Sequence, residues 1–588
     1  MARAVVRARG GRARPASPRY RGRRHGSRWH PQPARAAGPG GPAGGVTVFH
    51  PQWRETALAS LDEAYDLVVV GAGITGSGIA LDAAQRGLRT LLVERDDVGA
   101  GTSSRSSKLI HGGLRYLKQM QFRITRLACR ERDRMLSLSP HLVFPIRFLY
   151  PAYRGDRTPG WQIDFGLWMY DRLTGRPDRH AQLAAEELAA LAPGLDISEL
   201  DRGLAYSDAM ADDARLTLAV AATAHHYGAH LLTRCEVTGA QREAVGGAIA
   251  GVLLHDLTDG RTHRVRARLV VNATGAWTDA LRSRLGLAGS RVRPSRGIHL
   301  IIARDRLPIE AAVTLLAPDD GRPVFLIPHP EGVLVGTTDH YHDGTLDDPR
   351  PTAAEVDYLL RAAAAAFPGR HLTLADVRGT FAGLRPILDT HADDPSEATR
   401  EEGIWDEDGA LSVAGGKLTT WRSTAEEAVD AALRLMPEEE ARRFAPCATK
   451  GTPLSGLAPT DLAERLMRAF EVDAAVARGM ARRLGALAWT TAAAARRHSE
   501  LRPVAPDTDL CPAEVRAHLR WGAVIHLEDL LLRRVRLGMW DPEQAVAMLR
   551  PLRPILRSEM GWEWRRWKDE EDRFLSALEG WTMAGVRG

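Results

Sequence analysis

Short apolar runs separated by small or polar residues mark the first part of the chain. Residues 65–70 (YDLVVV) are rich in β-branched side chains, which predicts a strand buried on both faces of a parallel sheet. The small residues that follow predict a helix ending near Gly87, and residues 90–93 (TLLV) predict a second strand. This strand–helix–strand order indicates an α/β domain.

The later parts of the chain carry weaker patterns. Residues 300–302 and 333–335 predict strands framed by Pro and Gly residues. From about residue 440 the pattern changes to helices rich in Ala, Leu and Arg, which indicates a separate helical C-terminal domain. No apolar run approaches the ~18 residues that a membrane-spanning helix needs.

The charge is unevenly distributed along the 588 residues. The formal net charge is +6, but residues 1–54 hold twelve arginines and no acidic residue. Subtracting these twelve from the 79 basic residues leaves 67 against 73 acidic ones, a net charge of −6 for the remainder. The body of the protein is therefore not a basic nucleic-acid-binding domain, and we expect no nucleic-acid partner.

Residues 1–54 predict a disordered basic tail, because Arg, Ala, Gly and Pro dominate residues 1–45 without apolar periodicity. Three interpretations stay open. The tail could be an Arg-rich transit segment, a basic segment that binds an anionic membrane or nucleic acid, or an extension from a wrongly chosen start codon. We favour the last, with Val46 as the alternative start.

The four cysteines, at positions 129, 235, 447 and 511, lie far apart and form no C-x-x-C pair. This spacing gives no support to a disulfide framework, a zinc knuckle or a thioredoxin-like motif, and we expect no metal site. It is typical of a protein in a reducing cytoplasm.

A glycine motif follows the first predicted strand directly. Gly71 permits a tight turn, Gly73 lets the backbone approach a pyrophosphate, and Gly76 allows close packing of helix and strand. Glu94, 23 residues after Gly71, follows the second strand and can accept hydrogen bonds from a ribose 2′-hydroxyl. A glycine-rich turn in another kind of α/β protein is the alternative, but the complete context favours a dinucleotide site, and the acidic residue disfavours NADP. The motif alone does not distinguish FAD from NAD.

The segment after the second strand resembles the signature of FAD-dependent glycerol-3-phosphate dehydrogenases, which belong to the D-amino-acid-oxidase-like flavoproteins. The similar segment is residues 101–117 (GTSSRSSKLIHGGLRYL). The resemblance continues in order to about residue 430, with a weaker match at residues 528–534 (EDLLLRR). The further matching segments are 206–208 (YSD), 212–216 (DDARL), 270–277 (VVNATGAW), 296–299 (RGIH), 336–339 (GTTD), 383–386 (GLRP) and 415–420 (GGKLTT).

The resemblance implies an α/β fold, α+β overall, with a Rossmann-like FAD-binding domain, an interleaved antiparallel-sheet substrate domain and an all-helical C-terminal domain. The expected FAD-binding segments are 60–118, 205–285 and 378–435. The expected substrate-domain segments are 119–204 and 286–377, and the helical domain spans 440–588.

The resemblance also implies FAD as the cofactor. Hydroxyl-rich and glycine-rich segments suit a flavin, because hydroxyls and bare backbone can hydrogen-bond its diphosphate and ring edges. The residues expected to bind FAD are Gly71, Gly73, Gly76, Glu94, Thr102, Ser103, Ser104, His111, Gly112, Gly113, Ala273, Thr274, Gly275, Gly383, Gly416, Lys417, Leu418 and Thr419.

The expected reaction is oxidation of sn-glycerol 3-phosphate to dihydroxyacetone phosphate, with hydride transfer to flavin N5. This chemistry needs a general base and a cationic clamp for the phosphate. By resemblance the clamp is Arg115 and Arg385, with Lys417 as a further cation; Lys417 is one of only five lysines beside 74 arginines. His299 is the candidate base and His111 the rival, while Tyr116 either binds substrate or packs.

Two other groups of residues have simpler interpretations. Asp208, Asp212 and Asp213 lack metal-ligand spacing and are expected to be structural, with Asp213 and Arg215 organising the substrate-domain junction. The segment 561–568 (GWEWRRWK) could contact a bilayer interface, but we favour tryptophans that pack on the domain below.

The resemblance implies electron transfer to a membrane quinone by a cytoplasmic enzyme, peripheral on the inner face of the cell membrane, and we expect a homodimer. The alternatives are an oxygen-using flavin oxidase of the same fold, acting on glycerol 3-phosphate or on an amine or amino acid, and a catalytically silent FAD-binding protein. An ordinary NAD dehydrogenase is the weakest alternative, because the Ser-rich segment and the His-Gly-Gly turn have no role there.

Overall fold

A largely parallel sheet contains the first strand of the chain. In the computed structural model, β1 lies between β2 and β10 and pairs with both in parallel, and β7 and β18 extend the parallel part. β17 is antiparallel at one edge, while β8 and β9 form an antiparallel extension of β10. The strands are β1 (Tyr65–Val70), β2 (Thr90–Val93), β7 (His230–Leu232), β8 (Cys235–Arg242), β9 (Ile249–Asp256), β10 (Thr262–Asn272), β17 (Glu402–Glu407) and β18 (Ala410–Gly415).

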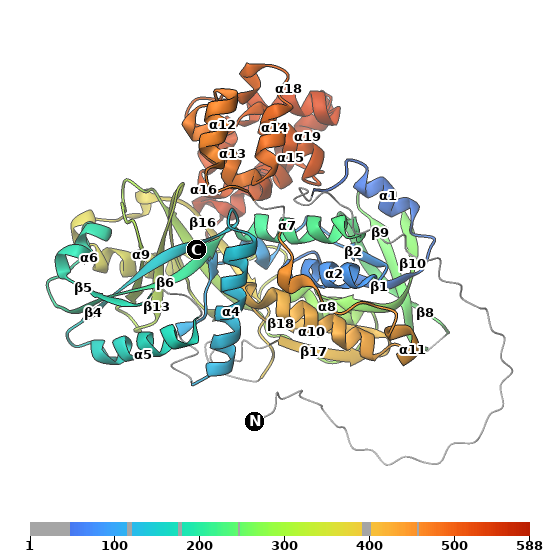
Figure 1. The fold of residues 1–588 in the computed structure, drawn as a ribbon, viewed down its shortest axis with the longest axis horizontal. Coiled ribbons are helices and arrows are strands. Elements are labelled where there is room, and N and C mark those ends of the chain that lie inside the picture. The colour runs from blue at the N-terminus through green and yellow to red at the C-terminus, as the bar shows by residue number, and fades with distance from the viewer. Residues whose placement is uncertain are drawn as a thin grey trace, which may run out of the picture. The chain divides into compact units, whose positions relative to one another are not determined.

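The apolar run of β1 is continuous because both of its faces are covered. Leu67 and Val69 pack in a core with residues of helices α2 (Ile74–Arg86), α7 (Asp213–His226) and α10 (Trp421–Arg434). In Figure 1 these helices lie alongside the strands of this sheet. Val68 and Val70 pack in a second core with β8, β9 and helix α8 (Thr278–Arg284). The predicted strands and the helix that ends at Gly87 are confirmed; Gly87 closes α2 at a φ of +93°.

A second, mixed sheet is mostly antiparallel. Its order is β15-β11-β14-β13-β12-β4-β6-β3, with β16 paired to β11 and β5 to β6. The predicted strands at residues 300–302 and 333–335 are confirmed as parts of β11 and β14. The strands are β3 (Leu109–Ile110), β4 (Val143–Tyr153), β5 (Ala181–Leu183), β6 (Leu200–Ala211), β11 (Ser295–Ile302), β12 (Ala312–Leu316), β13 (Pro323–His329), β14 (Gly332–Gly336), β15 (His340–Tyr341) and β16 (Val377–Arg385).

The remaining helices flank this second sheet or follow the last strand. Helices α4 (Phe122–Leu138), α5 (Gly160–Leu173), α6 (Ala185–Leu191) and α9 (Ala353–Ala366) belong to the part with the second sheet, and α11 (Glu438–Ala441) follows α10. The C-terminal helices, orange to red in Figure 1, form the predicted helical region. They are α12 (Leu462–Phe470), α13 (Ala474–Leu484), α14 (Leu487–Ala493), α15 (Pro512–Trp521), α16 (Leu537–Trp540), α17 (Pro542–Ala547), α18 (Leu549–Met560) and α19 (Trp564–Leu578).

The structure describes residues 48–587, except 115–119, 175–178, 245–246, 391–394, 396–401 and 455–457. Most of the predicted basic tail lies outside this range. Its last residues are packed, because Phe49 and Trp53 are buried and Phe49 N–H donates to the Trp521 carbonyl oxygen. Helix α1 (Trp53–Ala59) therefore begins inside the segment that the sequence assigned to the tail.

The strands of the two sheets come from the segments predicted for the two domains, except at three strands. β3 and β16 lie in segments predicted for the FAD-binding domain but pair in the second sheet, and β6 crosses the expected boundary at residue 205. All three strands pair within the second sheet. The expected domain limits stay a prediction. Within the part of the chain that the structure describes, no helix is long and apolar enough to cross a membrane.

A buried ionic cluster attaches the C-terminal region to the loop after β2. Asp97 accepts hydrogen bonds from Arg533 and Arg534, which lie on a π-helical segment (Asp529–Arg534). Asp97 and Arg534 are each only 1% exposed. Buried charges are tolerated only when they are paired and hydrogen-bonded, so this cluster depends on Asp97.

We predict that Asp97→Ala lowers the free energy of unfolding by about 3–5 kcal/mol, because it leaves the buried Arg534 guanidinium without its carboxylate partner and removes one carboxylate partner of Arg533, which keeps Asp529. Urea unfolding followed by circular dichroism measures this. The exposed Asp62 is the control, and Asp62→Ala should change stability by less than about 0.5 kcal/mol. Equal effects of the two substitutions would contradict the prediction.

Candidate active site

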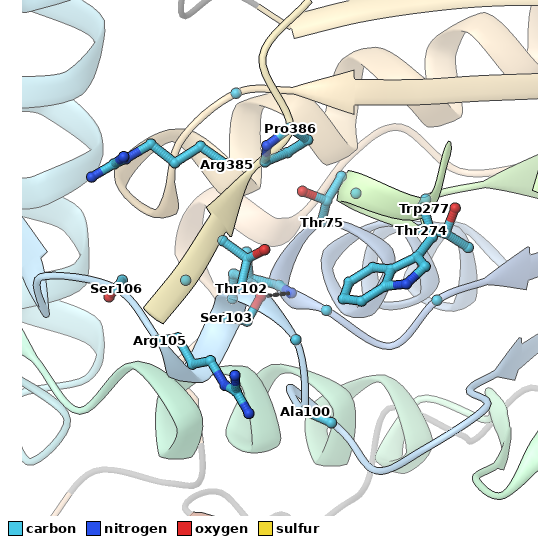
Figure 2. Close-up of a pocket in the computed structure, with 18 of the residues that line it drawn as sticks. Thr75, Ala100, Thr102, Ser103, Arg105, Ser106, Thr274, Trp277, Arg385 and Pro386 are labelled. Atoms are coloured by element: carbon cyan, nitrogen blue, oxygen red, sulfur yellow. Dashed lines mark hydrogen bonds between the residues drawn. The ribbon is translucent and has the colours of Figure 1, made fainter. Parts of the chain in front are cut away.

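A cavity of about 400 Å³ opens at the carboxyl ends of the parallel strands β1, β2, β10 and β18. This is the edge at which open α/β sheets bind their ligands. Its lining comes from the glycine turn after β1, the loop after β2, the turn after β10, and the ends of β16 and β18. Figure 2 shows side chains of these segments, including Thr75, Thr102, Ser103, Thr274 and Arg385.

The glycine turn after β1 excludes side chains at two positions. A Cβ at Gly71, where φ is +102°, would lie 2.7 Å from the Ala273 carbonyl oxygen, and one at Gly76 would lie 1.8 Å from the Gly71 carbonyl oxygen. Gly73 precedes the first residue of α2, and the Ile74 N–H there donates to Ser103 Oγ at 2.9 Å (Figure 2). The bare backbone and helix N-terminus fit a diphosphate.

Glu94 stands at the end of β2 and lines the cavity. Its two carboxylate oxygens accept hydrogen bonds from the N–H groups of Ala72 (2.8 Å) and Asp96 (2.9 Å). Burial, with a smaller contribution from the Asp96 charge, raises the pKa of Glu94 to about 7. The carboxyl group thus fixes the loop around the glycine turn and faces the position expected for a ribose.

The Ser-rich loop after β2 is held by one buried carboxylate. Asp213 accepts hydrogen bonds from both the N–H (3.1 Å) and Oγ (2.7 Å) of Ser106, from Lys108 Nζ (3.0 Å), and from Arg536 Nη2 (2.9 Å). Burial and the neighbouring Arg536 lower the pKa of Lys108 to about 8. The ion pairs of Asp213 with Lys108 and Arg536 therefore hold the Ser-rich loop in a fixed position.

His299 lies in the cavity wall on β11. Its Nε2 and Ser107 Oγ form a hydrogen bond of 2.8 Å, and its ring stacks on Phe381 at a centroid distance of 5.1 Å. The Nδ1 atom is buried without a hydrogen-bond partner among the described residues. Burial, with the charges of Arg385 and Lys108, holds the pKa of His299 well below its usual range, so the imidazole is in its neutral form at neutral pH.

Arg385 at the end of β16 is held in the cavity wall by polar contacts. Its Nη1 donates to Asp339 Oδ1 at 3.0 Å, and its Nη2 donates to Thr337 Oγ1 at 2.9 Å. Ser295 Oγ donates to the same Asp339 oxygen at 2.8 Å. A Cβ at Gly297 would lie 2.3 Å from Arg385 Nη2, so the guanidinium group uses the space left by that glycine.

The His-Gly-Gly turn is supported by a buried polar cluster from α4, α5 and β6. The Gly112 N–H donates to Tyr170 Oη at 2.9 Å, and Tyr170 Oη donates to Asp208 Oδ2 at 2.8 Å. Arg132 Nη1 donates to Asp208 Oδ1 at 2.7 Å. A Cβ at Gly112 would meet Tyr170 Oη at 2.4 Å, which explains the glycine. The expectation of a structural Asp208 agrees with these contacts.

The cavity brings together most of the residues that the sequence singled out, although their roles stay predictions. Gly76, Ser104, Gly112 and Gly113 lie beside the cavity without lining it, and Arg115 and Tyr116 fall outside the described residues. The predicted residues that line the cavity are Gly71, Gly73, Glu94, Thr102, Ser103, His111, Ala273, Thr274, Gly275, His299, Gly383, Arg385, Gly416, Lys417, Leu418 and Thr419.

Several residues around the cavity received no role from the sequence. Ser107 contacts His299, Asp339 contacts Arg385, and Tyr170 contacts the His-Gly-Gly turn. Ser107 and Asp339 lie inside segments 101–117 and 336–339, which resemble the family, and this position could have identified them as site residues. Tyr170 carried no local signal, because its contact joins residues 58 positions apart.

Family models and similar proteins all point to one family of flavoproteins. Residues 66–404 match the family described as "FAD dependent oxidoreductase", and residues 447–566 match the "C-terminal domain of alpha-glycerophosphate oxidase". A "Glycerol-3-phosphate dehydrogenase" from Mycobacterium leprae is 38% identical over 535 residues, which cover 88% of each chain. An "Aerobic glycerol-3-phosphate dehydrogenase" from Bacillus subtilis is 39% identical over 67% of this chain and 71% of that protein.

A solved structure shares the fold over nearly the whole chain. It is the glycerol-3-phosphate dehydrogenase from Bacillus halodurans in complex with FAD, at a TM-score of 0.74 and 28% identity, covering 91% of this chain and 98% of that chain. The coverage includes the helical C-terminal region. It agrees with the predicted combination of an FAD-binding fold and a helical C-terminal domain.

We predict that Gly76→Ala abolishes retention of the bound flavin, because the new methyl group would overlap the Gly71 carbonyl oxygen and displace the turn. The ratio of flavin to protein absorbance in the purified protein measures this. Gly166→Ala is the matched control, because Gly166 also lies in a helix and a Cβ there meets no atom within 4 Å. Full flavin content in Gly76→Ala would show that the turn does not hold the cofactor.

Proposed function

The chain belongs to the family of FAD-dependent glycerol-3-phosphate dehydrogenases, and we propose that it passes electrons from sn-glycerol 3-phosphate to a membrane quinone. The product is dihydroxyacetone phosphate. The observation that carries this proposal is one cavity that combines a glycine turn suited to a diphosphate with a neutral His299 and the cation of Arg385. Such a cavity offers both a base and an anion clamp.

The residues around the cavity fit FAD. The glycine turn and the N-terminus of α2 would hold the diphosphate, Glu94 the ribose, and the segments 273–275 and 416–419 the rest of the cofactor. Bound FAD supplies the acceptor, at flavin N5, for the hydride that leaves the substrate carbon.

His299 is assigned as the general base. Oxidation of a secondary alcohol removes a hydride from carbon and a proton from the hydroxyl oxygen, and the neutral imidazole can take that proton at Nε2. The hydroxyl of Ser107, a residue of the Ser-rich loop, is hydrogen-bonded to Nε2 at 2.8 Å and fixes the orientation of the ring. His111 lines the same cavity and is the rival base; its backbone N–H donates to Thr419 Oγ1 and its carbonyl oxygen accepts from the same hydroxyl.

Arg385 and Lys417 supply positive charge for the substrate phosphate. Arg385 is oriented by Asp339 and Thr337 before any ligand binds, so little side-chain entropy is lost on binding. Lys417 precedes a short 3₁₀ segment, residues 418–420, and also lines the cavity. By resemblance Arg115 is a further member of the phosphate clamp, and Tyr116 either binds substrate or packs; both lie outside the described residues.

The acceptor distinguishes the proposed dehydrogenase from an oxidase of the same fold. We propose a quinone, and with it a cytoplasmic, peripheral enzyme that acts as a homodimer. Steady-state turnover with sn-glycerol 3-phosphate and a soluble quinone analogue should form one dihydroxyacetone phosphate per quinone reduced. In air without quinone, stoichiometric hydrogen peroxide would instead identify an oxidase, and no product with either acceptor would contradict the proposed reaction.

We predict that Arg385→Ala raises the KM for sn-glycerol 3-phosphate about 10- to 100-fold while flavin stays bound, because a charge-assisted contact to the phosphate is lost. Steady-state kinetics measure this. Arg378→Ala is the matched control, because Arg378 lies on the same strand with an exposed side chain. An unchanged KM in Arg385→Ala would remove Arg385 from the phosphate site.

We predict that His299→Ala slows anaerobic flavin reduction about 100-fold or more with a smaller change in substrate affinity, because a general base is lost. Burial lowers the pKa of His299, so the base form persists as the pH falls through neutrality. Reduction by the unaltered protein should therefore decline only below about pH 6.5, the ordinary histidine value. Stopped-flow reduction across this pH range measures both effects. A decline centred near pH 7, or wild-type reduction by His299→Ala, would contradict the assignment.

A further inference from the structure

His299 lies inside the second sheet, and neighbouring strands enclose its ring. Its strand β11 pairs with β14 on one side and with β16 on the other, where His299 is opposite Gly336 and Phe381. The Phe381 ring stacks on the imidazole, and a Cβ at Gly336 would lie 2.3 Å from His299 Cδ2. His299 is therefore only 2% exposed, although it belongs to the wall of an open cavity.

The two ring nitrogens of His299 have different surroundings. Nδ1 is buried and has no hydrogen-bond partner among the described residues, whereas Nε2 lies 2.8 Å from Ser107 Oγ. Ser107 is half-buried and also lines the cavity. An imidazole nitrogen has one lone pair, in the plane of the ring, and a hydrogen bond of this length occupies it. A hydroxyl group in the cavity therefore meets the Ser107 oxygen before it meets the imidazole.

A serine hydroxyl donates one hydrogen bond and can accept others at the same time. With the imidazole proton on Nδ1, Ser107 donates to Nε2 and keeps a lone pair for a hydroxyl group in the cavity. We propose that Ser107 is a catalytic residue that relays the proton of the substrate hydroxyl to His299. This relay rests on the proposed function, because it divides the proton removal of that reaction into two linked transfers.

Two protons and one hydride move in the relay step. The substrate O–H bond breaks as its proton passes to Ser107 Oγ, and the Ser107 O–H bond breaks as its own proton passes to His299 Nε2. The C–H bond of the alcohol carbon breaks with its electron pair, and this hydride goes to the oxidised flavin that the reaction requires. The alcohol becomes a ketone, the Ser107 hydroxyl is restored, and His299 becomes an imidazolium.

Substrate binding prepares His299 to hold this proton. Burial, together with the charges of Arg385 and Lys108, keeps the pKa of His299 low in the free protein. A substrate phosphate bound to Arg385 offsets one of these charges, so it raises the proton affinity of the imidazole when the proton is to be transferred. The stacked Phe381 ring, with its centroid 5.1 Å from that of His299, also favours a cation at this position.

The position of Ser107 is fixed by its two neighbours in the chain. Ser106 donates to Asp213 from both its N–H and its Oγ, and Lys108 Nζ pairs with the same carboxylate at 3.0 Å. Proton transfer requires short and constant distances between donor and acceptor. The buried Asp213 cluster thus provides the rigidity that a relay through Ser107 needs.

The test is anaerobic stopped-flow reduction of the holoprotein by sn-glycerol 3-phosphate. We expect Ser107→Ala to slow flavin reduction about 100-fold with bound flavin and substrate affinity little changed, because acid–base catalysis is lost. Ser107→Thr keeps the hydroxyl and should restore most of the rate. Thr380→Val is the matched control and should leave the rate close to that of the unaltered protein, because the Thr380 hydroxyl donates to the His299 carbonyl oxygen at 2.8 Å instead of to the ring.

Two further measurements separate a relay from a hydroxyl that only orients the ring or binds substrate. In mixtures of H₂O and D₂O, the reduction rate of the unaltered protein should fall along a curve, because two protons move in the relay, whereas direct transfer of one proton gives a straight line. Adding Ser107→Ala to His299→Ala should slow reduction little further than His299→Ala alone, because residues that act as a unit are not additive.

Reduction by Ser107→Ala at the unaltered rate would overturn the relay, as would additive losses in the double variant. A straight line, or no solvent isotope effect, in the unaltered protein would also overturn it, and this result needs no variant to fold. A flavin-containing unaltered protein that sn-glycerol 3-phosphate fails to reduce would instead remove the proposed function, and the relay with it.

Discussion

The buried carboxylate of Asp213 is the interaction on which the site depends. It has no exposed surface and lies at the first turn of α7, where it also accepts the Ala214 N–H. A carboxylate in such a place requires compensating charge, and Lys108 and Arg536 provide it from segments far apart in the chain. One side chain thereby joins the Ser-rich loop, the first domain and the C-terminal region. From the sequence we expect Asp213 to organise the substrate-domain junction; its charged partners lie in the Ser-rich loop and the C-terminal region.

The geometry of the cavity follows from this anchor. The fixed loop presents Ser103 to the N-terminus of α2 and Ser107 to His299, so one segment touches both the expected diphosphate site and the expected base. The backbone of the glycine turn after β1 is open to close contact with a ligand, because no side chain fits at Gly71 or Gly76. The cluster of Tyr170, Asp208 and Arg132 supports the His-Gly-Gly turn beside the cavity. Rigid support of this kind is what a reaction with strict geometric demands needs.

Local features could be predicted from the sequence because they depend on local physics. The continuous apolar run of β1, the glycine spacing and the acid after β2 mark a dinucleotide-binding turn without further information. The pairing of β16 with β11 could not be predicted, since register between distant strands leaves no local pattern. The same holds for the contact between Asp339 and Arg385, and for Tyr170 beneath Gly112, which arise only when the second sheet and α5 are in place. The resemblance to a known family supplied the substrate, which no pattern of residues specifies by itself.

We propose that this cavity oxidises a phosphorylated secondary alcohol by way of a bound flavin. The most direct measurement is anaerobic addition of sn-glycerol 3-phosphate to the purified yellow protein, with absorbance followed near ~450 nm, where an oxidised flavin absorbs. We expect rapid bleaching with the phosphorylated substrate and none with the same concentration of glycerol. A spectrum unchanged by sn-glycerol 3-phosphate, or equal bleaching by glycerol, would contradict the proposed function.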